Sequence, residues 1–246
     1  MTDQKFGAII LAAGKGTRMK SDKAKVLHSI GGKSMVIRVI ESVLCLCRNH
    51  IHVVVGHQAE KVRSEVQRFH SNIHFATQAR LLGTGDAVKS ALGGISPAVD
   101  HVLVLCGDTP LIQAKTLADF LAFHGKEKRV VSVLSVIIEE PTGYGRIVQD
   151  DNGNVVAIRE EADADASEKK IQRVNTGIYC FDRSFLAQAI QEIQPDNNQA
   201  EYYLTDLVEI AVDKGYKIGC QLAPNAHEVM GVNTLEELEK AASLNP

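Results

Sequence analysis

The sequence has little that would tie it to a membrane, a nucleic acid or a secretion route. Its longest apolar stretch, Val130–Ile138, contains two serines and is far too short to span a bilayer. Twenty-seven basic and 30 acidic side chains give a formal net charge of −3 without any basic run, so we expect no nucleic-acid polymer as a partner. The apolar segment Phe6–Ala13 runs straight into a glycine-rich loop, so we expect no signal peptide.

Cysteine is scarce and follows no ligand-like spacing. The five cysteines are an odd number, and none belongs to a CxxC pair. A disulfide framework and a structural zinc site are therefore not expected. Buried, reduced thiols in a cytoplasmic protein are the simplest interpretation.

The first half of the sequence alternates between short apolar runs and amphipathic segments. A hydrophobic fraction of 45% over 246 residues suits one large α/β domain. The predicted strands are Phe6–Ala12, His52–Val55, Ile73–Thr77 and His101–Leu105, and the predicted helices are Ser34–Cys47, Gln58–Phe69, Gly83–Leu92 and Ala114–His124. This order predicts a Rossmann-like, doubly wound and mostly parallel sheet, whose ligands bind beyond the carboxyl ends of the strands.

The pattern changes after residue 128, which divides a predicted nucleotide-binding half (1–128) from a sugar-binding half (129–246) of one domain (1–246). In the second half, Arg146–Ile158 is typical of a hairpin in a β-rich insertion, and Asp151-Asn-Gly153 predicts a type I′ turn. We further expect strands at Val130–Ile138, Val174–Phe181 and Lys217–Leu222, an exposed loop at Asp163–Lys170, and helices at Arg183–Glu192, Tyr203–Lys214 and Thr234–Ala242.

The most informative segment is the loop after the first predicted strand. Leu11-Ala-Ala-Gly14-Lys15-Gly16-Thr-Arg18-Met19 places two glycines and two cations together, and Lys25 follows seven residues after Arg18. Backbone N–H groups in such a loop can approach phosphate oxygens closely, while Arg18 and Lys25 supply charge. Met19 stands where a dinucleotide fingerprint needs glycine, and no Gly-Lys-Ser/Thr closes a Walker A loop. An ordinary turn with exposed cations is the alternative.

Other candidate ligands follow later strands and belong to the same expected rim. Gln78 could contact a base edge through one donor and one acceptor, and Gly83-Thr84 predicts a helix start with Thr84 as its N-cap. Asp108, after Gly107 at a strand end, is placed to ligate a metal, and Asn233 before a helix could supply a second oxygen. The alternative interpretations are an ordinary capped helix start for Gly83-Thr84, an Asp-Pro turn for Asp108 and a plain N-cap for Asn233.

Three further positions suit a sugar. Gly145, Glu160 and Asn175 combine a glycine against which a flat ring can lie with side chains that bond hydroxyl groups. Each position is a weak signal alone and gains weight from its occurrence with the phosphate-type loop.

Together these motifs resemble the sugar-nucleotide pyrophosphorylases, most closely the N-terminal uridylyltransferase domain of bacterial bifunctional N-acetylglucosamine-1-phosphate uridylyltransferases. The resemblance covers essentially the whole chain. Besides the first loop, it rests on Gln78 with Leu82-Gly-Thr-Gly85, Pro141-Thr-Gly-Tyr-Gly-Arg-Ile147, Val174-Asn-Thr-Gly177, Glu201-Tyr-Tyr-Leu-Thr-Asp206 and Gly231-Val-Asn233.

The resemblance implies Mg²⁺-dependent transfer of UMP from UTP to N-acetylglucosamine 1-phosphate, which yields pyrophosphate and UDP-N-acetylglucosamine, a cell-wall precursor. Arg18 and Lys25 would be catalytic, and Asp108 and Asn233 would ligate Mg²⁺. The implied nucleotide-binding residues are Leu11, Ala12, Ala13, Gly14, Lys15, Gly16, Gln78, Gly83, Thr84, Gly107 and Asp108. The implied sugar-binding residues are Gly145, Glu160, Asn175 and Asn233. We expect a monomer or a weak oligomer.

Three departures from that family matter. Ala24 replaces the usual proline before the lysine, so Lys23 competes with Lys25, although Val26-Leu27-His28 favours Lys25. Cys106 stands where the family often has tyrosine. The sequence contains no hexapeptide repeat of the kind found in the acetyltransferase domain, so acetyl transfer is not expected. Another nucleotide and sugar pair, or a sugar-nucleotide-binding module without turnover, are the alternative functions.

Overall fold

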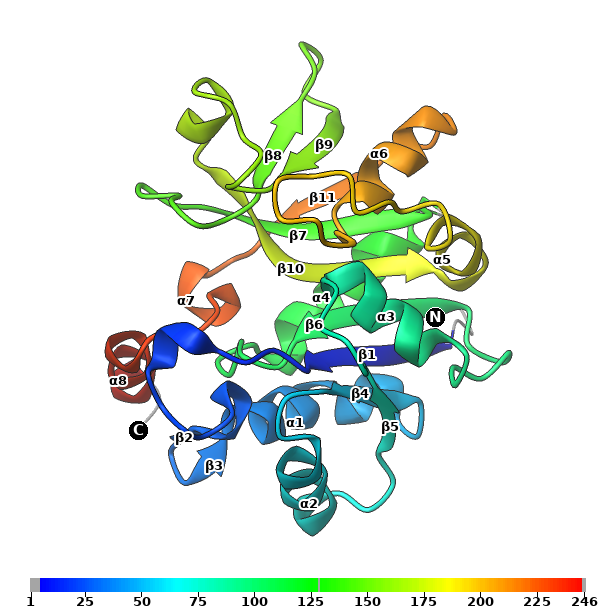
Figure 1. Cartoon of the computed structure of the whole chain (residues 1–246). Helices are drawn as coiled ribbons and strands as arrows, with labels where there is room; N and C mark the ends of the chain where they lie inside the picture. Colours follow the sequence, from blue (N-terminus) through cyan, green and yellow to red (C-terminus); the bar gives the residue numbers. More distant parts are fainter. Residues whose placement is uncertain (1–4, 128, 245–246) are drawn as a thin grey trace.

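A computed structural model describes residues 5–127 and 129–244; the predicted division at residue 128 lies outside them. Within these ranges, a nine-stranded mixed sheet runs through the molecule, with helices on both faces (Figure 1). Across the sheet the order is β11 (Gly219–Leu222), β7 (Val131–Ile137), β10 (Arg173–Asp182), β6 (His101–Cys106), β1 (Phe6–Ala12), β4 (Ile51–Val55) and β5 (His74–Thr77). The strands β8 (Arg146–Gln149) and β9 (Val155–Arg159) form a hairpin that joins β10 through β8.

The strands β6, β1, β4 and β5 form the parallel half of the sheet. The apolar runs of β1, β4 and β6 are almost wholly buried, as expected for strands covered on both faces. The predicted α/β architecture is therefore confirmed, and the carboxyl ends of β1 and β6 lie side by side because Leu11 is in register with Cys106.

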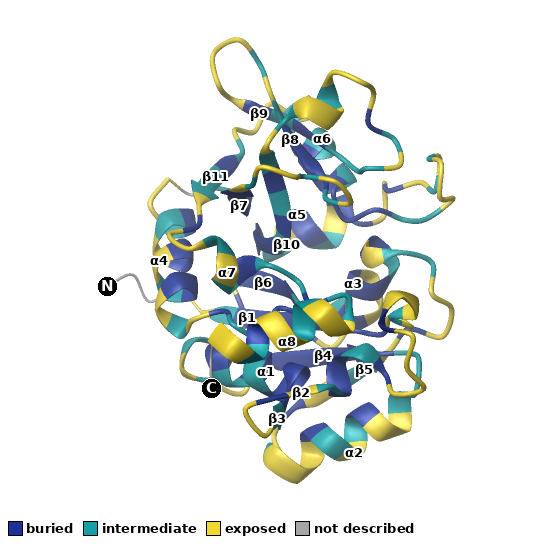
Figure 2. Ribbon diagram, turned by 90° about the vertical axis from the view of Figure 1, so that its left-hand side faces the viewer, coloured by how far each residue is buried: buried dark blue, intermediate teal, exposed yellow. Residues whose placement is uncertain are grey.

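Helices cover both faces of the sheet and enclose two large apolar cores, and a small third cluster forms around Ile30 and Met35. One core lies under α1 (Met35–Cys47), α2 (Ala59–Phe69), α4 (Ala114–Gly125) and α7 (Ala226–Val229). The other lies under α3 (Thr84–Leu92), α5 (Arg183–Ala189) and α6 (Asp206–Asp213). Figure 2 shows the strands as the most buried layer, with exposed outer surfaces on α2 and on α8 (Leu235–Leu244). No helix in the described ranges has the length and apolar character needed to cross a bilayer.

Strand β10 is where the parallel pattern ends. It runs antiparallel to both β6 and β7, and its register with β7 shifts between Asn175 and Ile178. Before this bulge the strand pairs with β8 through Val174, and after it the strand pairs with β6 from Tyr179 to Asp182. Gly177 adopts a φ of 76°, which a side chain would disfavour, so the bulge is built into the sequence. The end of β6 thus faces an irregular strand.

The hairpin between β8 and β9 is present, but the predicted type I′ turn is wrong. That turn needs positive φ at both central residues, and neither Asp151 nor Asn152 has it. The Asp150 carboxylate accepts the N–H groups of Asn152 at 2.9 Å and Asn154 at 2.8 Å. This side chain fixes the turn, and the positive φ falls on Gly153 alone.

Several boundaries and short elements also differ from the sequence prediction. The helix expected from Tyr203 begins at Asp206, because the backbone of Tyr202 bonds Leu82 and Gly85 instead. The expected exposed loop 163–170 ends in the 3₁₀ turn η3 (Glu168–Lys170). The short elements β2 (Ser29–Ile30), β3 (Lys33–Ser34), η1 (Thr17–Met19), η2 (Lys25–Leu27) and α7 were not predicted.

Candidate functional site

A cavity of about 490 Å³ lies beyond the carboxyl ends of β1 and β6, where ligands of such sheets are expected. The first loop, the start of α3 and the segment after β6 form its walls. It is lined by Leu11, Ala12, Ala13, Gly14, Lys15, Gly16, Thr17, Lys25, Val26, Gln78, Leu81, Gly83, Thr84, Ala87, Cys106, Asp108 and Glu201. Of the predicted nucleotide-binding residues, only Gly107 is not among them, and its N–H donates to Leu11 in the adjoining wall at 2.8 Å.

The first loop is folded so that Lys25 passes directly against it. Gly16 has a φ of 63°, and a Cβ on it would collide with the Cβ of Lys25. Met19, only 1% exposed, anchors the end of η1 in the protein. Glycine at position 16 is therefore required by both backbone conformation and close approach, which the phosphate-loop interpretation alone did not reveal.

Four predicted residues from separate parts of the chain meet at one side of this cavity. The Lys25 ammonium forms an ion pair with Asp108 and donates to Asn233 Oδ1 at 2.9 Å. Arg18 donates to the same amide oxygen, also at 2.9 Å. The side chains of Lys25 and Asp108 are 15% and 16% exposed, so water screens the attraction between their charges only partly. The arrangement gathers two cations around two oxygen-bearing side chains.

Asn233 is free to face these cations because its neighbours cap the following helix. Thr234 Oγ1 accepts the N–H of Glu237 at 3.1 Å, and Glu237 Oε2 accepts the N–H of Thr234 at 3.1 Å and that of Asn233. This reciprocal pair is a capping box. The plain N-cap alternative for Asn233 is therefore wrong, and Thr234 has that role.

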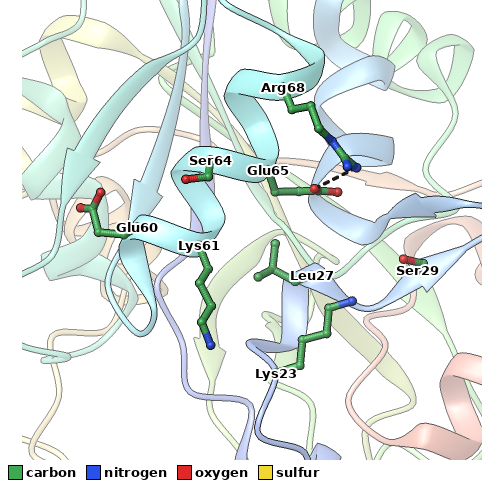
Figure 3. A pocket seen from close by; sticks show the side chains of 8 residues that line it. All are labelled: Lys23, Leu27, Ser29, Glu60, Lys61, Ser64, Glu65 and Arg68. Carbon is green, nitrogen blue, oxygen red and sulfur yellow. Dashed lines mark ion pairs between the residues drawn. The ribbon is translucent and has the colours of Figure 1, made fainter.

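The two competing lysines lie in different places. Lys25 is in the cavity, whereas Lys23 lines a separate groove of about 610 Å³ against α2. Figure 3 shows Lys23 in that groove beside Leu27, with Lys61, Glu65 and Arg68 on the helix opposite. The geometry thus brings Lys25, and not Lys23, together with Asp108 and Asn233.

At the far end of the cavity, Gln78 is oriented by protein acceptors. Its amide nitrogen donates to the Gly83 carbonyl at 3.0 Å and to Asp86 Oδ2 at 2.8 Å. Two acceptors fix the direction of the amide, so its oxygen is the group left for a ligand. Thr84 does not cap α3 as predicted, because its hydroxyl accepts the N–H of Leu204 at 3.0 Å.

The predicted sugar-binding residues Gly145, Glu160 and Asn175 also meet, outside the lining of that cavity. A Cβ on Gly145 would lie 3.4 Å from Glu160 Oε2 and 3.5 Å from the Cβ of Asn175. Glu160 Oε1 accepts the Thr205 hydroxyl at 3.2 Å. Burial raises the pKa of the Glu160 carboxyl, and the Thr205 hydrogen bond opposes that shift. Asn233, the fourth predicted sugar residue, instead lies with Lys25.

The nucleotidyl transferase family matches residues 7–227. The chain belongs to this family. Similar curated proteins, each named "Bifunctional protein GlmU", include those of Halalkalibacterium halodurans (44% identical over 234 residues, 95% of this chain and 51% of that protein), Pelobacter propionicus (44% over 241 residues, 98% and 52%) and Clostridioides difficile (43% over 239 residues, 97% and 51%). The chain spans about half the length of these relatives.

Membership of the nucleotidyl transferase family identifies the chain as a nucleotidyltransferase.

Cys106 lies between the cavity and the bulge of β10, with its Sγ 3.9 Å from the Gly177 carbonyl oxygen. Burial raises the pKa of its thiol to about 12, so the group is neutral and unreactive at ordinary pH.

Several residues that line the cavity were not predicted from the sequence. Thr17, Val26, Leu81, Ala87 and Glu201 line the cavity but were not predicted as site residues. Glu201 belongs to the segment 201–206 that carried part of the family resemblance, so that motif held the signal. The other four lie within three positions of predicted residues, and only the fold brings them into the wall.

Proposed function

We propose that the chain transfers UMP from UTP to N-acetylglucosamine 1-phosphate, with Mg²⁺ as the metal. The observation that carries the proposal is the meeting of Arg18, Lys25, Asp108 and Asn233 beside the cavity. Family membership supports nucleotidyl transfer. The relatives' printed names do not state a substrate, so the substrates rest on the residues and on the motif resemblance.

The proposed reaction needs no protein nucleophile. A phosphate oxygen of the sugar 1-phosphate attacks the α-phosphorus of UTP and forms the new P–O bond. The bond from the α-phosphorus to the bridging oxygen of the β-phosphate breaks, and its electron pair leaves with pyrophosphate. Catalysis of this kind depends on positioning and on offsetting charge.

Arg18 and Lys25 would supply most of the protein's positive charge at the reacting phosphates. The attacking group and the target are both anionic, so their repulsion must be offset before the oxygen can approach. Exposed Lys15 in the same loop could reach the outer phosphates. The loop backbone around Gly14 and Gly16 would contribute N–H donors.

The side chains of Asp108 and Asn233 fit a magnesium ion. Their oxygens converge on one cationic group, Lys25 Nζ, so both face a single position that a cation can take. One carboxylate and one amide oxygen suit Mg²⁺, which completes its shell with phosphate oxygens and water. When bound, Mg²⁺ would neutralise phosphate charge during the transfer. No cluster of three or more His, Cys, Asp or Glu ligands occurs in the described part of the chain.

The orientation of Gln78 supports uracil as the base. Its amide oxygen can accept the N3–H group of uracil, whereas cytosine presents an unprotonated N3 at that edge. A pocket that leaves a polar group unpaired rejects the wrong ligand more strongly than a pocket of altered size does. UTP is therefore favoured over CTP.

Glu160, Asn175 and Gly145 would bind the acetamido sugar. Glu160 can accept hydrogen bonds from sugar hydroxyls, and Gly145 leaves room for the ring against the backbone.

We also retain a monomer or weak oligomer as a prediction. Reducing conditions such as the cytoplasm suit the five free thiols.

The test is pyrophosphate release by the purified chain. UTP, CTP, dTTP and GTP are each combined with N-acetylglucosamine, glucose and N-acetylgalactosamine 1-phosphates, with and without Mg²⁺. We expect Mg²⁺-dependent release confined to UTP with N-acetylglucosamine 1-phosphate and lost in Asp108→Ala. Release with another pair would replace the substrates. Nucleotide binding without release would favour the non-catalytic module.

A further inference from the structure

The most voluminous fully buried side chain in the described part of the protein is a charged one, Arg146 at the start of β8. It is 1% exposed. Its guanidinium donates to Glu161 Oε2 at 2.7 Å, to the Lys169 carbonyl at 3.5 Å and to the Tyr144 carbonyl. A buried arginine needs such partners, since an unpaired charge in the interior is strongly destabilising.

Glu161 holds the segment before β8 from two sides. The oxygen that accepts Arg146 also accepts the backbone N–H of Gly143 at 3.1 Å. Hydrogen bonding from Arg146 lowers the pKa of the Glu161 carboxyl, so the pair remains charged at neutral pH. One carboxylate therefore links both ends of the turn 143–146.

Both members of this pair are sequence neighbours of residues assigned above to the sugar. Arg146 follows Gly145, and Glu161 follows Glu160. Gly145 lies so close to Glu160 that a Cβ on it would approach Glu160 Oε2 to 3.4 Å. The carbonyl of Gly145 also accepts the N–H of Asn175 at 2.8 Å. A small shift of the turn would therefore change the spacing of all three groups.

We propose that Arg146 and Glu161 are positioning residues that set the spacing between Gly145 and Glu160, and thereby the affinity for the sugar 1-phosphate. Neither residue lines the nucleotide cavity. This inference rests on the proposed function, because it assigns the sugar to the wall formed by Gly145 and Glu160. It predicts a defect in one substrate only.

The Arg146–Glu161 pair holds the turn 143–145 as well as the hairpin of β8 and β9. The ladder between β8 and β9 already holds residues 146–149 against 155–159, but it does not include residues 143–145. Apart from the bonds to the pair, that turn has the bond from the Tyr144 N–H to the Pro141 carbonyl at 3.1 Å and the Gly145–Asn175 bond. Loss of the carboxylate should therefore loosen the turn and leave the sheet intact.

The test compares Glu161→Gln with Glu41→Gln. Glu41 pairs with Lys33 at 2.7 Å and is 34% exposed, close to the 2.7 Å and 33% of Glu161, but it lies on α1 and makes no bond to the turn, so it is a matched control. For the sugar 1-phosphate and nucleotide that the wild type turns over, we expect Glu161→Gln to raise the sugar KM about tenfold, the factor for loss of one charge-assisted bond. The nucleotide KM should change less than twofold, and the control should match the wild type.

Amide hydrogen exchange provides a second measurement, since a peptide covering 141–147 should exchange faster in Glu161→Gln but not in the control. Arg146→Lys, which keeps the charge but loses the planar fork, should reproduce the sugar defect. An unchanged sugar KM, or equal rises for both substrates, would overturn the inference in an active enzyme. Absence of turnover in the wild type would instead contradict the proposed function.

Discussion

The Lys25 ammonium lies 2.9 Å from the side-chain oxygen of Asn233, 208 positions further along the chain, and it pairs with Asp108 as well. The cation thus sits between the two side chains whose oxygens suit a metal ion. Two consequences can be tested separately: the identity of the essential lysine and the competition between that lysine and a divalent cation.

Lys25→Met should lower kcat for pyrophosphate release by about 10²–10³, the usual effect of removing one group that stabilises a transition state. Lys23→Met is the control, because Lys23 lies in the groove beside α2 and outside the cavity. Its rate should stay within twofold of the wild type. A large loss in Lys23→Met with normal activity in Lys25→Met would reverse the assignment.

Lys25→Met should also bind Mn²⁺ more tightly than the wild type in the absence of nucleotide. The ammonium and a divalent cation are attracted by the same two oxygens, so removing the ammonium frees them. Calorimetric titration should give a dissociation constant at least several-fold lower, and Asp108→Ala should abolish the gain. Equal or weaker Mn²⁺ binding by Lys25→Met would contradict the competition.

Asp86→Ala should weaken discrimination against CTP. Asp86 is one of two acceptors that orient the Gln78 amide, and without it the amide can rotate and present its nitrogen. The ratio of kcat/KM for UTP to that for CTP should fall about fivefold, as expected for one hydrogen bond worth about 1 kcal/mol. Substrate competition assays measure this ratio directly, and an unchanged ratio would show that Gln78 does not read the base.

Gly83→Ala should destabilise the protein and impair nucleotide binding. Gly83 has a φ of 107°, and an added Cβ would lie 2.6 Å from the Tyr202 carbonyl oxygen. Gly93→Ala, at the other end of α3, is the matched control, with a φ of −63° and nothing within 4 Å of the new methyl group. We expect urea denaturation to show a loss above about 1 kcal/mol for the first and no loss for the second.

Stability should fall as the pH drops below about 6.5, because a buried histidine is kept neutral. His124 Nδ1 lies 2.9 Å from Ser132 Oγ and its Nε2 lies 3.1 Å from His101 Nδ1. Burial, with further contributions from His101 and Arg129, lowers the pKa of His124 to about 3. The unfolded chain, with its higher pKa, therefore takes up the proton first as the pH falls.

The contribution of His124 should be complete above pH 6.5 and decline by up to about 1.4 kcal/mol per pH unit below it. Urea unfolding of the wild type and of His124→Gln at pH 7.5, 6 and 5 measures this slope. The variant should lose less stability over the same interval. Parallel pH profiles would show that His124 is not the titrating group.

The parallel half of the fold could be predicted because its information is local. Continuous apolar runs such as that of β6, and short connections between strands and helices, indicate buried strands of a mostly parallel sheet. Asp108 and the first loop were predicted to share a rim for the same reason, since the carboxyl ends of adjacent parallel strands meet.

The second half depends on contacts between distant segments. Nothing local in Arg173–Asp182 indicates that β10 pairs first with β8 and then with β6, because that exchange depends on the bulge at Gly177. The late start of α6 has the same origin, as the backbone of Tyr202 is held by residues 82 and 85. The orientation of Gln78 likewise depends on Asp86, which sequence reasoning did not consider.

The contact between Arg18 and Asn233, 215 positions apart, has a consequence for biosynthesis. During translation the strands that form the floor of the cavity emerge early, but Asn233 is aimed only after Glu237 has been added and has closed the capping box. A nascent chain can therefore shape much of the cavity while the ribosome still holds the segment that carries Asn233 and Glu237. The candidate site should be complete only after residue 237 has left the ribosome, whereas the strands beneath the cavity can pack earlier.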